Sequence, residues 1–189
     1  MEYRKMKSKK RAVWVAQYGM LIALAFIFSY LEAIIPVPIP VPGVKLGLAN
    51  LVTIVGLYTV GVKGTAVVSL IRIVLVGLTF GNMFSMVYSL AGGSLSLLLM
   101  ILCKKNNWFS QIGVSIIGGI GHNVGQLVIA SIVVQTTGVF YYLPALLVAG
   151  VLAGAVIGLL GGMVTERIQG IVKKCRQSKR ICMVSPGWT

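Results

Sequence analysis

The sequence predicts an all-α membrane protein with six transmembrane helices and with both termini in the cytoplasm. Of its 189 residues, 57% are hydrophobic, whereas soluble domains contain about 45–50%. Only 11% are charged, and the 17 basic residues outnumber the 3 acidic ones. Most basic residues gather at the two ends of the chain, and long apolar runs lie between them. These observations indicate that lipid rather than water surrounds most of the chain.

Each apolar run is expected to form one helix. The runs cover residues 13–35, 46–60, 65–80, 83–102, 109–135 and 141–165. A helix needs about 20 residues to cross the hydrocarbon core, so the second and third runs are short. The first run follows a basic segment, as in a signal peptide, but no cleavage site of small residues follows it, and we keep it as a helix. Residues 1–12 and 166–189 are then basic cytoplasmic segments on either side of a transmembrane domain of residues 13–165.

The loops set the orientation, because cytoplasmic loops carry an excess of Lys and Arg. With the N-terminus inside, the inner loops 61–64 and 103–108 contain three lysines, and the outer loops contain only Lys45. The basic termini could instead bind nucleic acid. However, basic clusters that flank apolar spans are typical of contacts with anionic lipids at the cytoplasmic face. We therefore expect a multi-pass protein of the cell membrane without a nucleic-acid partner.

Four prolines alternate with apolar residues in the first outer loop, at Pro36, Pro38, Pro40 and Pro42. Proline fixes φ and lacks an amide hydrogen, so this segment should be a stiff extended strap rather than a helix. It could close over an outward-facing cavity as a lid, or it could be a rigid spacer between two helices. We favour the lid, because a spacer does not require apolar residues to face water.

Small residues recur every four positions in the last three helices. The last run contains Gly150, Gly154, Gly158 and Gly162, the fifth contains Gly121 and Gly125, and the fourth contains Ser85, Ser89 and Gly93. Residues four apart lie on one face of a helix, and small side chains there let helix backbones approach closely. The pattern predicts helix packing rather than chemistry.

Few polar residues lie inside the apolar runs or at their outer ends. The candidate substrate-binding residues are Glu32, Lys45, Asn50, Arg72, His122, Asn123 and Gln126. Inserting a charged side chain into a bilayer costs about 2.5–3.5 kcal/mol, so each is a candidate for function. Each could instead be bonded to a neighbouring helix, and Glu32 with Arg72 could be a structural ion pair. Because the expected topology places all seven in the middle or outer half of the membrane, we expect one pocket. Its two cations against one carboxylate favour a small anionic ligand.

Several kinds of chemistry have no residues to support them. The chain has no aspartate, so it lacks Asp-rich motifs for Mg²⁺ and diphosphate, and it has no G-x-x-x-x-G-K-[ST] loop for ATP hydrolysis. A single histidine and three separate cysteines, Cys103, Cys175 and Cys182, do not make a metal site, and we interpret the cysteines as free thiols. We therefore expect no metal, no cofactor and no catalytic residue, and hence not an enzyme by itself.

Two motifs carry a resemblance to a known family. The segments Tyr30-Leu31-Glu32 with Gly43-Val44-Lys45-Leu46-Gly47-Leu48-Ala49-Asn50, and Gly119-Ile120-Gly121-His122-Asn123-Val124-Gly125-Gln126, resemble the membrane family heptaprenyl diphosphate synthase component I. That family is similar to the S components of energy-coupling-factor (ECF) transporters, also called Gx transporters. The resemblance implies an S-component-like bundle, a pocket capped by the loop after the first helix, and a separate transmembrane coupling protein with two ATPases. It also implies docking on that partner through small residues four apart in the first helix, here Ala12 and Ala16.

Three functions remain open at this point. The first is a substrate-binding, S-component-like subunit for uptake of a small anionic solute, such as an isoprenoid or quinone precursor. The alternative is a membrane accessory subunit of heptaprenyl diphosphate synthase, in isoprenoid or menaquinone synthesis, which accepts or positions the lipid product beside a soluble catalytic partner. The third is a structural membrane scaffold. Co-purification with ATPases or with an Asp-rich synthase distinguishes the first two.

Overall fold

The computed structural model describes residues 2–34, 47–81, 83–106 and 109–184, with side chains described between residues 12 and 170. The helices are α1 (Glu2–Ile34), α2 (Asn50–Thr59), α3 (Gly61–Thr79), α4 (Met83–Lys105), α5 (Gln111–Val134) and α6 (Leu143–Val184), with a 3₁₀ helix η1 (Thr137–Tyr142) before α6. No strand occurs in these ranges. Five helices are long and apolar enough to cross a membrane, and α2 is shorter. The prediction of an all-helical, multi-pass membrane protein is confirmed.

Several helix boundaries differ from the expected ones. α1 starts at Glu2 rather than at residue 13, and α4 ends at Lys105 rather than at residue 102. α2 starts at Asn50 rather than at residue 46, because Gly47 adopts φ +85° in a turn that precedes the helix. Glycine accepts a positive φ at little cost because it has no Cβ. Residues 61–64, expected as an inner loop, are instead the first turn of α3. α6 continues without interruption to Val184, so the basic segment expected after residue 165 begins as part of the last helix.

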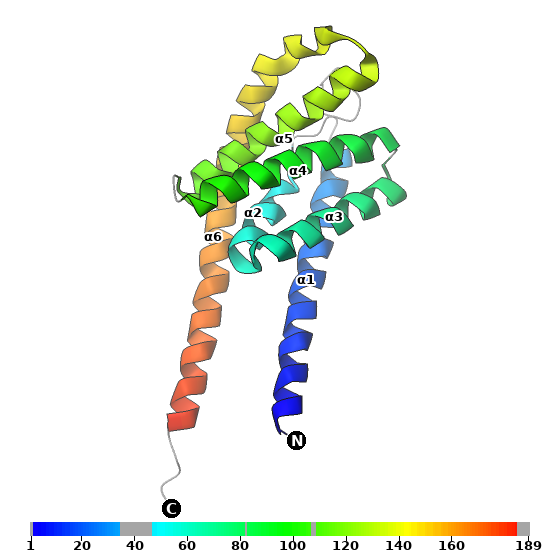
Figure 1. Ribbon diagram of the computed structural model, residues 1–189. Coiled ribbons are helices and arrows are strands. Elements are labelled where there is room, and N and C mark those ends of the chain that lie inside the picture. Colours follow the sequence, from blue (N-terminus) through cyan, green and yellow to red (C-terminus); the bar gives the residue numbers. More distant parts are fainter. Residues whose placement is uncertain (1, 35–46, 82, 107–108, 185–189) are drawn as a thin grey trace, which may run out of the picture.

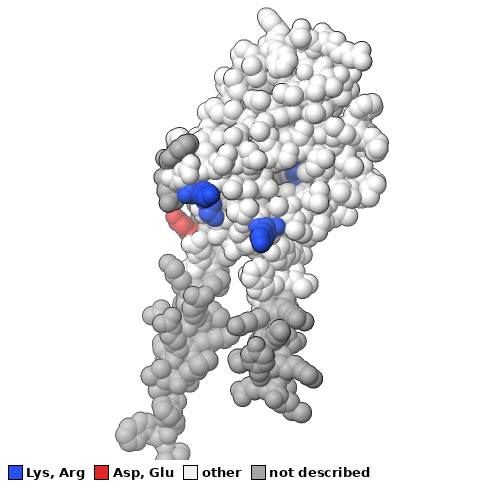
Figure 2. All heavy atoms as spheres, in the orientation of Figure 1, with Lys and Arg blue, Asp and Glu red and all other residues white. Residues whose placement is uncertain are grey.

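The terminal helices extend from one end of the molecule. In Figure 1, α1 and α6 leave the bundle at the same end, and α3, α4 and α5 lie side by side above it. Most of the Lys and Arg visible in Figure 2 lie at that end. Lys104 at the end of α4 donates a hydrogen bond to the carbonyl oxygen of Leu57, and its Nζ lies 4.3 Å from the ring centre of Tyr58. The positive-inside rule assigns such a basic end of the molecule to the cytoplasmic side.

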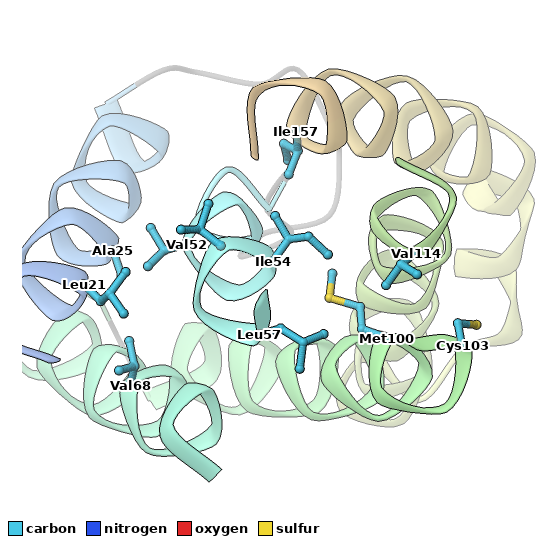
Figure 3. Close-up of a cluster of buried hydrophobic side chains, with 11 residues drawn as sticks. Leu21, Ala25, Val52, Ile54, Leu57, Val68, Met100, Cys103, Val114 and Ile157 are labelled. Atoms are coloured by element: carbon cyan, nitrogen blue, oxygen red, sulfur yellow. The ribbon is translucent and has the colours of Figure 1, made fainter. Parts of the chain in front are cut away.

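α2 lies at the centre of the hydrophobic core. Its Ile54 and Leu57 side chains are fully buried, and the cluster around them draws side chains from each of the other five α-helices (Figure 3). The outer faces of the long helices carry large exposed apolar side chains, such as Leu78 on α3 and Leu152 on α6. Arg72, by contrast, is buried. Large apolar side chains on the outer surface, together with a charged side chain inside, suit a protein that is surrounded by lipid.

Four of the expected glycines, Gly125, Gly150, Gly154 and Gly158, pack helices together as predicted. A Cβ atom would come within 3.2 Å of the backbone of a facing helix at Gly92, Gly119, Gly125, Gly150, Gly154 and Gly158. These contacts join α5 to α4 on one side and to α6 on the other. Gly162 is the exception, because nothing lies within 4 Å of its Cβ position. The neighbouring Gly161 packs instead, against Ile54 of α2.

Candidate functional site

A small polar cavity lies among α1, α3, α4, α5 and the turn before α2. It is lined by Ser29, Glu32, Gly47, Arg72, Ile73, Val76, Ser89 and His122. Its space is about 310 Å³ when the open mouth is included, but only about 10 Å³ admits the centre of a water molecule. That is close to the minimum for one water, about 10–15 Å³. In this structure the cavity accommodates one small polar group rather than a whole vitamin-sized solute.

Glu32 holds the turn that leads into α2. Its Oε1 accepts a short hydrogen bond from the amide of Gly47 and a longer one, 3.4 Å, from the amide of Leu48. Amides at the start of a helix lack partners and carry partial positive charge, so a carboxylate is stabilised there. A Cβ on Gly47 would lie 3.1 Å from both Asn50 Nδ2 and His122 Cδ2. The turn therefore depends on glycine both for its positive φ and for its close contacts.

Arg72 is the cation of the cavity. It lies about 16 Å along α3 from Gly61 and is 7% exposed. Its Nη1 donates to Ser29 Oγ at 3.5 Å, the longest distance that still counts as a hydrogen bond, and Glu32 attracts it electrostatically. Its Nε has no hydrogen-bond partner within the described part of the chain. A guanidinium has five N–H donors, and this environment leaves the one on Nε without an acceptor among the described residues.

Asn50 provides a second donor beside the cavity. The side chain is 3% exposed, and its Nδ2 has no hydrogen-bond partner among the residues that the structure describes. It lies next to the cavity-lining residues Gly47 and His122, as the position of a Cβ on Gly47 shows. A buried donor without a partner costs about 1–3 kcal/mol. Folding alone therefore does not account for an amide at this position.

On α5, neighbouring polar residues face different helices. His122 lines the cavity, and its Nε2 lies 3.0 Å from Nε2 of the fully buried Gln126, one turn further along the helix. Asn123 instead donates from Nδ2 to the carbonyl oxygen of Leu146 on α6, at 2.8 Å. The structure therefore separates Asn123 from the cavity, and its hydrogen bond joins α5 to α6.

The structure thus brings together five of the seven expected binding residues: Glu32, Asn50, Arg72, His122 and Gln126. Lys45 and the strap prolines Pro36, Pro38, Pro40 and Pro42 lie outside the described residues. Ala12 and Ala16 are exposed on α1. Two polar lining residues, Ser29 and Ser89, were not expected as site residues, and neither were Gly47, Ile73 and Val76. Ser29 could have been found, because it precedes Glu32 by three positions and so shares its helix face.

Comparison with known families gives one match. The family model described as heptaprenyl diphosphate synthase component I matches residues 21–164, which include every residue that lines the cavity. Searches among curated proteins and solved structures found no match. The matched description supports the accessory-subunit alternative better than the transporter hypothesis. Neither the coupling protein nor the two ATPases implied by the S-component resemblance gains support from it.

Proposed function

Because the chain belongs to the heptaprenyl diphosphate synthase component I family, we propose that it is a membrane subunit that anchors a soluble prenyl diphosphate synthase at the cytoplasmic face. The chain contains no aspartate, whereas Mg²⁺ at phosphate substrates is commonly held by carboxylates. Catalysis then belongs to the soluble subunit. This chain supplies a fixed place beside the bilayer, where a long apolar product partitions spontaneously.

The observation that carries the proposal is the length of the two terminal helices. The first apolar run of the sequence starts at residue 13 and the last ends at residue 165, whereas α1 starts at Glu2 and α6 ends at Val184. At 1.5 Å per residue, about 16 Å of α1 and about 28 Å of α6 continue past these runs. These extensions contain six basic residues within 4–11 and five within 173–180. Two basic helices that leave the bundle at one end (Figure 1) suit an acidic partner.

An apolar groove lies near the point where these helices leave the bundle. It is lined by Gln17, Met20 and Leu21 of α1, by Thr59 and Val60 at the end of α2, and by Ile168 of α6. About 70 Å³ of it admits water-sized groups, which is room for an apolar side chain. We propose that an amphipathic segment of the soluble subunit inserts one apolar side chain here. Acidic residues beside that side chain would then face the basic extensions.

Co-purification tests the proposal. The full chain is isolated in mild detergent, and the proteins bound to it are identified by mass spectrometry. A soluble synthase with paired Asp-rich motifs should remain bound at low salt and dissociate as salt is raised, because salt screens exposed charges. Met20→Ala should weaken the complex about tenfold, the loss expected for truncating one well-packed interface side chain.

Met163→Ala is the matched control. Met163 is 57% exposed on α6, close to the 59% of Met20, but it does not line the groove. Binding of the synthase should be unchanged in this variant. Isolation of a transmembrane coupling protein with two ATPases, and of no synthase, would refute the proposal in favour of transport. Equal binding by the two methionine variants would exclude the groove as the docking site.

A further inference from the structure

We infer that the cavity around Arg72 binds a phosphate-type oxyanion, either free or as the head group of a lipid. The inference stands on the geometry of the cavity and does not depend on the docking of a synthase. It goes beyond the family description by naming the atoms that bind and the chemical class that they recognise.

Two buried donors carry the inference. Arg72 Nε and Asn50 Nδ2 have no hydrogen-bond partner in the described ranges, and their side chains are 7% and 3% exposed. Buried polar groups are nearly always bonded, so two unpartnered donors beside one cavity indicate a missing acceptor. Both donors belong to different helices, α3 and α2, and the hydroxyl groups of Ser29 on α1 and Ser89 on α4 line the same cavity.

The distribution of these donors over four helices favours phosphate over carboxylate. A carboxylate is planar and presents two oxygens, whereas a phosphate presents oxygens in three or four directions. The donor groups belong to α1, α2, α3 and α4, which line or adjoin the cavity. Arg72 also offers the fork geometry that suits phosphate oxygens.

Glu32 does not take the place of this ligand. One of its oxygens already accepts hydrogen bonds from the amides of Gly47 and Leu48, so part of its charge is stabilised at the start of α2. Arg72 is attracted by Glu32, and among the described lining residues it is the cation that an incoming anion meets. The cavity has room for about one water-sized group. Only the terminal oxygens of the ligand therefore enter, and the rest of the ligand lies toward the mouth.

Ligand binding to the isolated chain tests the inference. The melting temperature of the full chain in detergent is measured with inorganic diphosphate, with farnesyl diphosphate and with farnesol. A rise with farnesyl diphosphate alone identifies a lipid head group, and a rise with both diphosphates identifies an anion that binds without a tail. Either result supports the inference. No rise with either diphosphate, or an equal rise with farnesol, would overturn it.

Variants of Asn50 and Arg72 test whether these two side chains bind the anion. Asn50→Leu keeps a similar volume and removes an unpartnered donor, so the free chain should remain at least as stable while diphosphate affinity falls at least tenfold. Arg72→Lys keeps the charge and loses the fork, with a fall of similar size. Lys105→Gln, an exposed cation at the far end of α4, should bind as the unmodified chain does. If Asn50→Leu is folded and binds diphosphate with unchanged affinity, the assignment is wrong even where Arg72→Lys does not fold.

Discussion

Replacing Gly154 by alanine should separate α6 from α5. A Cβ at this position would lie 2.6 Å from the Cα of Ile116 and 2.9 Å from the carbonyl oxygen of Ser115. Both are backbone atoms, so a side-chain rotation cannot relieve the contact. Since ordinary contacts begin near 3.4 Å, the two helices have to move apart by about 0.8 Å. The same movement would loosen the neighbouring contacts of Gly150 and Gly158 with α5.

The magnitude follows from two opposing effects. Overpacking of a tight interface costs about 1–3 kcal/mol, and replacing glycine by alanine within a helix returns up to about 1 kcal/mol. Gly162→Ala is the matched control on the same helix, because nothing lies within 4 Å of that Cβ position. It should show only the favourable effect. The two variants should therefore differ in unfolding free energy by about 1–3 kcal/mol, with Gly154→Ala the less stable.

The assay is reversible unfolding in mixed micelles, in which the denaturing detergent is titrated and helix content is followed by circular dichroism. Diphosphate binding by the folded fraction of Gly154→Ala should stay near that of the unmodified chain, since Gly154 faces α5 backbone and does not line the cavity. Equal stability of the alanine variants at 154 and 162 would refute the close-packing argument. If Gly154→Ala has normal stability but no longer binds diphosphate, Gly154 belongs to the binding site.

Three further predictions concern orientation, the turn at Gly47 and the Glu32–Arg72 pair. Reporter fusions after Lys105 and at the C-terminus should read cytoplasmic, and an external signal at Lys105 would contradict the six-helix topology. Gly47→Ala should lower the melting temperature more than Gly61→Ala, because both positions have positive φ but only Gly47 has crowded surroundings; equal losses would mean that φ alone decides. Arg72→Gln should destabilise the chain, and adding Glu32→Gln should restore stability only in part, because the Glu32 carboxylate also holds the amides before α2. Full recovery in a thermal unfolding assay would show a purely structural ion pair.

The sequence predicted the helices well where lipid dictates composition. An apolar run of about 20 residues has few alternatives to a membrane helix, and every expected run corresponds to an observed helix. The ends were less predictable, because hydropathy marks where lipid ends and not where the helix ends. Lys, Arg and Gln are frequent after residue 170, yet they are good helix formers, so α6 continues to Val184. α3 starts at Gly61, whose positive φ makes the connection to α2 a tight turn rather than the loop of residues 61–64 that the apolar runs suggested.

The site was predictable in part for a similar reason. Polar residues in apolar runs are few, so Arg72, Glu32 and His122 were recognisable, and helix order alone suggested that they meet. The sequence does not say which neighbour each helix face meets, so Asn123 could not be separated from Gln126. Their positions are only about 60° apart around the helix, and only the arrangement of α4 and α6 about α5 assigns them to different partners.

The short central helix has a consequence for how the protein is made. α2 is ten residues long, about 15 Å, which is half of the hydrocarbon thickness. Such a segment is not stable in lipid by itself, so it has to enter the bilayer together with a neighbour. Its most extensive contacts are with α6, which is synthesised after α1 to α5, and Gly161 of α6 packs against Ile54. The core of this bundle is therefore completed only after α6 has been made, and chains that stop before α6 should be recognised as unfinished and degraded.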